Sequence, residues 1–219
     1  MLTVWCVWWR DPSPIDKDKY SAYHVQRLQR TVAENLSIPH RFVCITRERV
    51  DGVTCFAPLV EWPGWWQKIA LFRPGMAGGG VNLYLDLDVV ITGSLDPIVE
   101  SLGQHALAMP LNWAQSGHGG CQSSVIVWRD CRVNQQIYKT FNPAHAYWPP
   151  RNDGGRLWGD QEHITRCRDD GVIQVHPLPE PWIKSYKYHC RNGLPDDCRV
   201  VVFHGLPKPE AVSESWFRW

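Results

Sequence analysis

The apolar positions of the first fifty residues follow two patterns, one typical of buried strands and one typical of an amphipathic helix. Residues 2–9 are almost wholly apolar and precede a proline-containing breaker at 11–14, which predicts a buried β-strand. Over 17–36 the apolar residues recur at helical spacing and Pro39 follows, which predicts a helix. Residues 41–46 predict a second buried strand. A strand, helix, strand order indicates parallel pairing.

The remainder of the chain continues this mixed pattern. A short amphipathic helix is predicted at 65–72, and a strand is predicted at 81–85 after a run of glycines. Residues 142–156 are rich in proline, glycine and aromatic residues and predict a long surface loop. Further strands are predicted at 106–111, 123–128 and 199–203, and further helices at 130–141 and 159–170. We therefore expect a single α/β domain over residues 1–219.

Composition and charge narrow the classes of function. Lysine and arginine total 23 against 22 for aspartate and glutamate, so no overall field attracts the chain to nucleic acid or to an anionic membrane. The 8 cysteines lack paired metal spacings, and neither a signal-peptide pattern nor a membrane-spanning apolar run is present, so we expect reduced thiols and a cytoplasmic location. The 13 tryptophans suit stacking on sugar faces, although we expect most of them in the core.

Two carboxylates follow the predicted strand at 81–85. Asp86 and Asp88 lie two residues apart, so on an extended chain their side chains face the same way while Leu87 faces the other. Carboxylate oxygens are hard ligands that suit magnesium or manganese, and a pair of them can hold such an ion against a diphosphate. The alternative is that both are ordinary turn carboxylates at the end of a strand.

A second group of candidate residues follows the last predicted strand. His204 could add a nitrogen ligand, and one nitrogen among several oxygens suits manganese somewhat better than magnesium. Alone it would more often be a structural histidine. Gly205 permits a close approach of the backbone, and Lys208, between two prolines, offers a positive charge to phosphate. Together these residues predict a phosphate clamp.

Four motifs, in this order, resemble the GT-A-fold glycosyltransferases, and among them the retaining glycosyltransferase family 8 with its glycogenin-like and galactosyltransferase members. They are LYLDLDVV at 83–90, GSLDP at 93–97, GDQ at 159–161 and FHGLPKP at 203–209. The resemblance implies a Rossmann-like domain with a mixed, mostly parallel central sheet flanked by helices. It also implies transfer of a sugar from a nucleotide-diphosphate sugar, a UDP-sugar, to an acceptor hydroxyl with retained anomeric configuration.

The same resemblance implies roles for the residues of the first and last motifs. Asp86, Asp88 and His204 would hold Mn²⁺ (or Mg²⁺), and Asp86 would also contact the ribose of the donor. Gly205 and Lys208 would contact the diphosphate.

Three further residues match positions that contact the donor in that family. Lys68 would be a basic donor-binding residue, with a solvated lysine as the alternative. Asp160 would bind hydroxyls of the donor sugar, with a helix N-cap as the alternative, and Gln161 would lie near the reacting carbon. The sequence departs from the family pattern at 122–125 and at Glu210, where an aromatic residue is frequent.

Because no second carboxylate stands at the spacing of a double displacement, we expect front-face attack, with a β-phosphate oxygen taking the proton of the acceptor. Two rival functions remain. One is a haloacid dehalogenase-like phosphohydrolase with Asp86 as nucleophile, whose motif normally closes the first strand. The other is a non-catalytic carbohydrate-binding protein.

The acceptor stays open among a glycan, a lipid-linked sugar, a protein hydroxyl and a modified nucleic-acid base. Residues 182–191 interleave aromatic and basic side chains, which could grip a nucleic acid. We favour the alternative, an exposed strand with solvated lysines.

Overall fold

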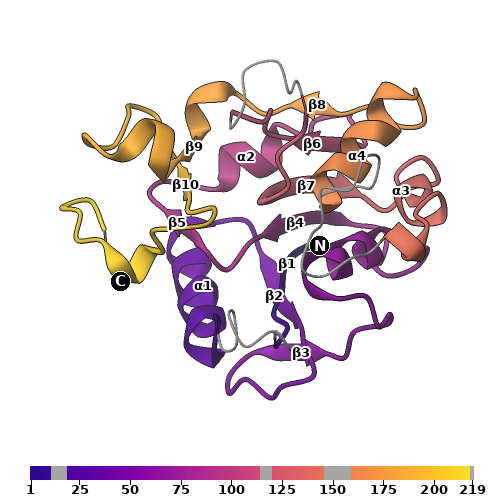
Figure 1. Cartoon of the computed structure of the whole chain (residues 1–219), viewed down its shortest axis with the longest axis horizontal. Coiled ribbons are helices and arrows are strands. Elements are labelled where there is room, and N and C mark those ends of the chain that lie inside the picture. The colour runs from indigo at the N-terminus through magenta and orange to yellow at the C-terminus, as the bar shows by residue number, and fades with distance from the viewer. Residues whose placement is uncertain (11–18, 114–119, 146–158, 218–219) are drawn as a thin grey trace.

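The computed structural model describes residues 1–10, 19–113, 120–145 and 159–217. Its main feature is a seven-stranded sheet in the order β3-β2-β1-β4-β7-β6-β8 (Figure 1). These strands are β1 (Leu2–Val7), β2 (His40–Ile45), β3 (Thr54–Phe56), β4 (Val81–Leu85), β6 (Leu107–Met109), β7 (Val125–Arg129) and β8 (His176–Pro177). The strands from β3 to β4 are parallel, β7 is antiparallel to β4 and β6, and β8 is parallel to β6. The predicted mixed, mostly parallel sheet is confirmed.

Helices cover both faces of this sheet, which is why its strands are apolar on both sides. On β1, Val4 and Cys6 belong to one core cluster and Trp5 and Val7 to the other. The first cluster includes side chains of α1 (Ala22–Asn35) and α2 (Asp96–Glu100). The second includes side chains of the 3-10 helix η1 (Gly64–Phe72), α3 (Gln135–Lys139) and α4 (Asp160–Asp169). The chain therefore has two hydrophobic cores, one on each side of the sheet.

Helix α1 forms where the apolar spacing predicts it. Ser21 is the N-cap residue, and its backbone N–H donates to His24 Nδ1 at 3.0 Å. Val25, Leu28 and Val32 are buried on one face. The helix begins five residues after the predicted start, and the segment 11–18 before it lies outside the described residues.

A second, three-stranded sheet connects the two halves of the chain. It consists of β5 (Val89–Ile91), β10 (Val200–Val202) and β9 (Ile183–Ser185), with β10 in the centre. Val202 pairs with Val89 in antiparallel register, and the Phe203 amide donates to the Asp88 carbonyl at 3.0 Å. This pairing brings the segment that follows β10 next to the acid pair.

Several predicted elements differ from the observed ones. The predicted helix at 130–141 is helical only over Gln135–Lys139, and most of the predicted loop at 142–156 lies outside the described residues. The preferred exposed strand at 182–191 is wrong: Ile183–Ser185 is a buried strand that a π-helical turn, Tyr186–Cys190, follows. Lys184 is 8% exposed, because β9 packs beside β10 rather than at the surface. The remaining short helices are η2 (Pro143–His145), η3 (Glu180–Trp182) and η5 (Pro209–Ala211).

The structure agrees with the predictions of free thiols and of tryptophans that mostly lie in the core. All eight cysteines are free thiols. Every tryptophan in the described ranges is buried in a core cluster or packs against one. No helix in the described ranges combines the length and the apolar character needed to cross a membrane.

Candidate active site

A cavity of about 420 Å³ opens at the edge of the main sheet where β1 and β4 end. Because β7 runs antiparallel to β4, the segment that enters β7 lies at the same edge, and the N-terminus of α4 completes the wall. This is the edge at which open α/β sheets bind ligands. Seven of the eight predicted site residues line the cavity: Lys68, Asp86, Asp88, Asp160, Gln161, His204 and Gly205. The eighth, Lys208, reaches it through a contact with Asp88.

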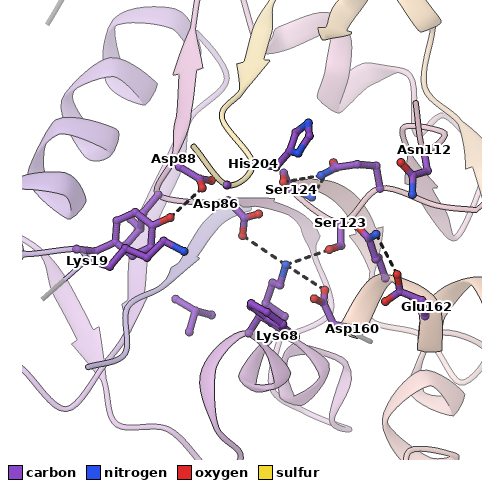
Figure 2. A pocket seen from close by; sticks show the side chains of 18 of the residues that line it. Lys19, Lys68, Asp86, Asp88, Asn112, Ser123, Ser124, Asp160, Glu162 and His204 are labelled. Carbon is purple, nitrogen blue, oxygen red and sulfur yellow. Dashed lines mark hydrogen bonds and ion pairs between the residues drawn. The ribbon is translucent and has the colours of Figure 1, made fainter. Parts of the chain in front are cut away.

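Lys68 is the centre of one polar network, and its side chain points into the cavity (Figure 2). Its ammonium nitrogen lies 3.0 Å from Asp160 Oδ2 and 3.4 Å from Asp86 Oδ1, and it donates to Ser123 Oγ at 3.0 Å. Tyr84 donates its hydroxyl to the same Asp86 oxygen at 2.6 Å. Lys68 is 3% exposed, so the alternative of a solvated lysine is wrong. The N-cap of α4 is Gly159, so the alternative of Asp160 as N-cap is wrong as well.

The charges in this network shift one another's pKa values. Burial raises the pKa of Asp160 to about 6; the Lys68 ammonium opposes this rise and the Asp86 carboxylate adds to it. Burial by itself would lower the pKa of Lys68, but the Asp160 and Asp86 carboxylates outweigh it and raise that pKa. One cation thus serves two carboxylates, the buried Asp160 and the half-buried Asp86.

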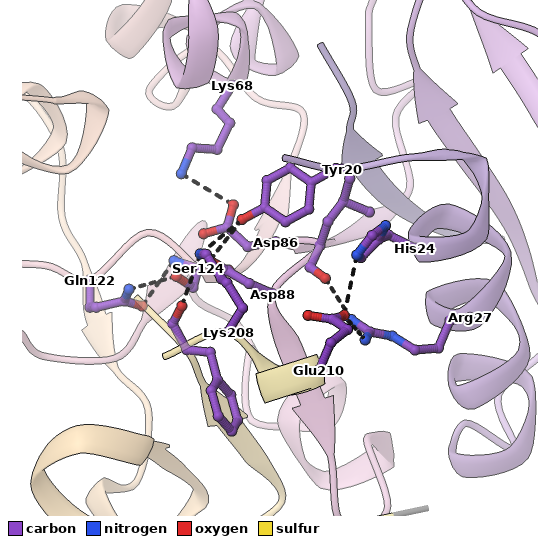
Figure 3. A network of polar contacts seen from close by, with 12 residues as sticks. Tyr20, His24, Arg27, Lys68, Asp86, Asp88, Gln122, Ser124, Lys208 and Glu210 are labelled. Atoms are coloured by element: carbon purple, nitrogen blue, oxygen red, sulfur yellow. Dashed lines mark hydrogen bonds and ion pairs between the residues drawn. The ribbon is translucent and has the colours of Figure 1, made fainter. Parts of the chain in front are cut away.

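Asp88 anchors a second network, which Figure 3 shows. Its Oδ2 accepts hydrogen bonds from Lys208 Nζ at 2.6 Å and from the Tyr20 hydroxyl at 2.8 Å. Lys208 Nζ also donates to the Phe203 carbonyl at 3.2 Å. Burial raises the pKa of Asp88, but the Lys208 charge and these hydrogen bonds outweigh it and lower that pKa. Asp88 is therefore an ionised carboxylate at the cavity.

His204 lies on the opposite side of Asp86 from Lys68 (Figure 2), and Gly205 follows it along the cavity wall. His204 Nε2 forms a hydrogen bond with Ser185 Oγ at 2.7 Å, and the Tyr188 ring stacks on the imidazole at 5.6 Å between ring centroids. Burial and the nearby Lys187 lower the pKa of His204, which favours the neutral imidazole. Gly205 has φ +72°, and a Cβ there would lie 2.8 Å from Lys187 Nζ. The positive φ favours glycine at this position, and the predicted approach of its backbone to phosphate stays a prediction.

The acid pair has the donor chemistry for a hard divalent cation. Both carboxylates line the cavity, and the hydrogen bonds described above reach Asp86 through Oδ1 and Asp88 through Oδ2. Two carboxylates at one edge fit Mg²⁺ or Mn²⁺. Within the described ranges, however, no three His, Cys, Asp or Glu side chains gather into a group that could hold a metal ion. His204 therefore shares the cavity with the acids but is bonded to Ser185 rather than grouped with them.

Sequence reasoning missed several residues of the cavity. Trp9 and Trp65 line it, whereas their chain neighbours Trp8 and Trp66 are buried in the cores. The high tryptophan content was a usable signal, because indole rings stack well on sugar faces. Tyr20 gave no such signal, because its position fits the apolar face of a helix.

Glu210 forms a charged cluster with α1 just outside the cavity. Its Oε1 accepts a hydrogen bond from Arg27 Nη1 at 2.6 Å and lies 3.2 Å from His24 Nε2 (Figure 3). Burial opposes the ionised form, but the His24 hydrogen bond and the Arg27 charge lower the pKa of Glu210 from 4.5 to about 2. Glu210, where the sequence departs from the family pattern, thus has Arg27 and His24 as partners.

This shift predicts a pH-dependent stability difference between the protein and its Glu210→Gln variant. A carboxyl whose pKa is lowered on folding stabilises the fold above its unfolded pKa, and that contribution is lost as the pH falls from 4.5 towards 2. Because the side chain is 41% exposed, solvent screening limits the effect to about 1 kcal/mol, roughly 2–4 °C in melting temperature. Melting curves of both proteins between pH 7 and pH 2 should converge at the acid end. A gap that stays constant over that range would contradict the assignment.

Comparisons with known proteins agree on the fold. No family model matches the chain, and no curated protein matches its sequence. Among solved structures, the chain is similar to the galactosyltransferase LgtC in complex with donor and acceptor sugar analogs, with a TM-score of 0.55, 14% identity and coverage of 95% of this chain and 89% of LgtC. An active-site glutamine-to-glutamate mutant of LgtC matches with a TM-score of 0.56, 14% identity and the same coverage. The bifunctional glycosyltransferase WbbM matches with a TM-score of 0.65 and 11% identity over 95% of this chain and 46% of WbbM. The chain has the GT-A glycosyltransferase fold.

Proposed function

We propose that this chain is a glycosyltransferase that moves a sugar from a nucleotide-diphosphate sugar, a UDP-sugar, to an acceptor hydroxyl with retention of the anomeric configuration. One observation carries the proposal: the residues of three motifs that are far apart in the sequence line a single cavity in a GT-A fold. That cavity holds both the carboxylates that suit a divalent ion and the cations that suit a diphosphate.

Opposite ends of the cavity suit the diphosphate and the sugar of a nucleotide-sugar donor. Lys208, whose ammonium group lies beside the acid pair, would contact the diphosphate, and Gly205 would let the backbone approach it. At the other end, Asp160 and Gln161 at the start of α4 would bind the donor sugar and face its reacting carbon. LgtC has an active-site glutamine, which supports this role for Gln161.

We propose Asp86 and Asp88 as ligands of Mn²⁺ (or Mg²⁺), with His204 as a third ligand once it exchanges its bond to Ser185. When bound, such an ion supplies Lewis-acid stabilisation of the charge that develops on the departing diphosphate. Lys208 supplies a second positive charge at the same place. Lys68 keeps Asp160 and Asp86 in position and so orients the donor.

The acceptor hydroxyl would attack from the side of the leaving group and pass its proton to a β-phosphate oxygen. This route requires no enzymic nucleophile and relies on positioning and electrostatics. We propose a sugar as the acceptor, since LgtC has been observed with an acceptor sugar analog. The competing acceptor classes are lipid-linked sugars, protein hydroxyls and modified nucleic-acid bases.

Release of nucleoside diphosphate from a panel of donor sugars, followed by mass spectrometry in the presence of Mn²⁺, tests the proposal. We expect turnover of a UDP-sugar, and the productive donor is then used to screen the four acceptor classes. Hydrolysis of simple phosphate esters without donor turnover would instead favour the phosphohydrolase. That alternative is already weakened because Asp86 follows β4 rather than the first strand. Sugar binding without any turnover would favour a carbohydrate-binding protein.

Removal of divalent ions should abolish the transfer. Because carboxylates lose their affinity for the donor diphosphate when no cation stands between them, we expect treatment with EDTA to lower the transfer rate by about 10²-fold or more. Mn²⁺ should restore the rate, and Mg²⁺ should restore it less completely. Dialysis against EDTA, followed by titration with each ion, measures both effects. Full activity in metal-free buffer would refute the metal site.

A further inference from the structure

Arg27 forms hydrogen bonds with two segments of the site: the one that contains Asp86 and Asp88, and the one that contains Lys208. It lies on α1 and is 4% exposed, so its guanidinium group is buried. Its Nη2 donates to the Leu87 carbonyl at 2.8 Å, and its Nη1 donates to Glu210 Oε1 at 2.6 Å (Figure 3). One planar fork therefore holds two segments that are far apart in the sequence.

Both acceptors of this fork are adjacent to residues that face the cavity. Leu87 is the residue between Asp86 and Asp88, and its side chain belongs to the core. Glu210 lies two residues after Lys208, in the short helix η5 (Pro209–Ala211). A shift of the guanidinium group would consequently move the acid pair relative to the ammonium group of Lys208.

Side chains rather than backbone hydrogen bonds hold the turn that carries Lys208. Leu206, in its centre, is 76% exposed. In the part of the chain that the structure describes, no backbone amide of residues 204–208 donates a hydrogen bond. Three side chains fasten this turn to the rest of the protein: His204, through its bond to Ser185 Oγ, Lys208 and Glu210. Burial of an arginine is costly unless its partners are well placed, so the fork holds both segments at a defined separation.

We propose that Arg27 and Glu210 are positioning residues that set the distance between the Asp86–Asp88 pair and Lys208, and thereby the affinity for the diphosphate of the donor. The proposal rests on the proposed function for its ligand, but the positioning itself can be measured without turnover. Neither residue contacts the donor: Arg27 acts through Leu87 and Glu210, and Glu210 acts through the turn that carries Lys208.

Affinity for UDP in the presence of Mn²⁺, measured by calorimetry, tests the proposal. We expect Glu210→Gln to weaken UDP binding about 10-fold, the lower end of the effect of residues that orient a ligand-binding group. Arg27→Lys keeps the charge but cannot hold two acceptors in one fork, so it should act in the same direction. Asp96→Asn is the matched control: Asp96 accepts hydrogen bonds from the Ser37 and Ile38 amides after α1, away from the cavity, and its loss should leave UDP affinity unchanged.

A double-mutant cycle separates positioning from a general loss of stability. In a Lys208→Met background, Glu210→Gln should have no further effect on UDP affinity. Unchanged affinity in Glu210→Gln, or equal 10-fold losses with and without Lys208, would overturn the proposal.

If the unmodified protein neither binds UDP nor turns over any donor, the proposed function fails, and hydrogen exchange decides the positioning alone. Glu210→Gln should then speed exchange in 86–90 and at Phe203, Ala211 and Val212, whose amides are hydrogen-bonded, whereas Asp96→Asn should speed it only around 36–38 and 94–96. Unchanged exchange in 86–90 and at those three amides of Glu210→Gln would also overturn the proposal.

Discussion

Asp88→Asn is expected to lower the rate of sugar transfer by about 10²–10³-fold while the protein remains folded. Asparagine keeps the size of the side chain and can still accept the Tyr20 hydrogen bond, but it removes the charge that pairs with Lys208 and that would hold the cation. The side chains of Asp88 and Lys208 are 11% and 18% exposed, so the released ammonium group retains access to water and the fold loses little.

Initial rates with the productive donor, together with circular dichroism and a melting curve, measure these two effects separately. Asp96→Asn serves as the control, because it removes one carboxylate charge from a site outside the cavity. Wild-type turnover in Asp88→Asn would remove the acid pair from the mechanism.

Lys68→Met is expected to have the largest effect on stability. Methionine matches the length of the side chain, but it leaves Asp160, which is 3% exposed, without its counter-ion. Loss of one partner from a buried ion pair costs about 3–5 kcal/mol. For a chain of this size that corresponds to a fall of roughly 6–20 °C in melting temperature. Urea unfolding at pH 7 measures the loss.

Two further variants distinguish the stability lost with the ion pair from the stability lost with side-chain packing. Lys184→Met removes a lysine that is also buried but is paired with Glu180, whose side chain is 78% exposed, so it should cost about 1 kcal/mol or less. Lys68→Met combined with Asp160→Asn should recover much of the lost stability, because no unpaired charge then remains. A Lys68→Met variant as stable as Lys184→Met would contradict the buried network.

The pH dependence of Lys68→Met has a definite sign. A carboxyl whose pKa is raised on folding destabilises the fold when it is ionised, and this cost falls as the pH drops from about 6 to 3.8. Without Lys68 the pKa of Asp160 should rise further. The stability gap between Lys68→Met and the unmodified protein should therefore narrow in acid.

The elements that the sequence predicted well are those whose pattern is local. The strand at 81–85 is observed with the same bounds, and α4 differs from its prediction by one residue at each end. Strong apolar runs and clear breakers define such elements without help from the rest of the chain. The motif residues Lys68 and Asp160 were also found, although their ion pair was not anticipated.

The predictions that failed depend on distant partners. The segment 182–191 has the alternating pattern of an exposed strand, yet Lys184 is buried because β9 pairs with β10. The spacing of apolar residues predicts Tyr20 on the apolar face of a helix, yet its hydroxyl contacts Asp88. Neither contact has a signal in the neighbouring residues, because each depends on how two separate elements pack.

The sequence by itself determined the fold class, the placing of Asp86 and Asp88 at a strand end, and seven of the residues that line the cavity. These properties follow from hydrophobic period and from short motifs, which act over a few residues. Only the tertiary structure decided that Val202 pairs with Val89, that Lys208 consequently meets Asp88, and that Arg27 holds both segments. These contacts join residues that are far apart in the sequence, and local sequence patterns do not determine them. They form only when the complete sheet and its helices pack together.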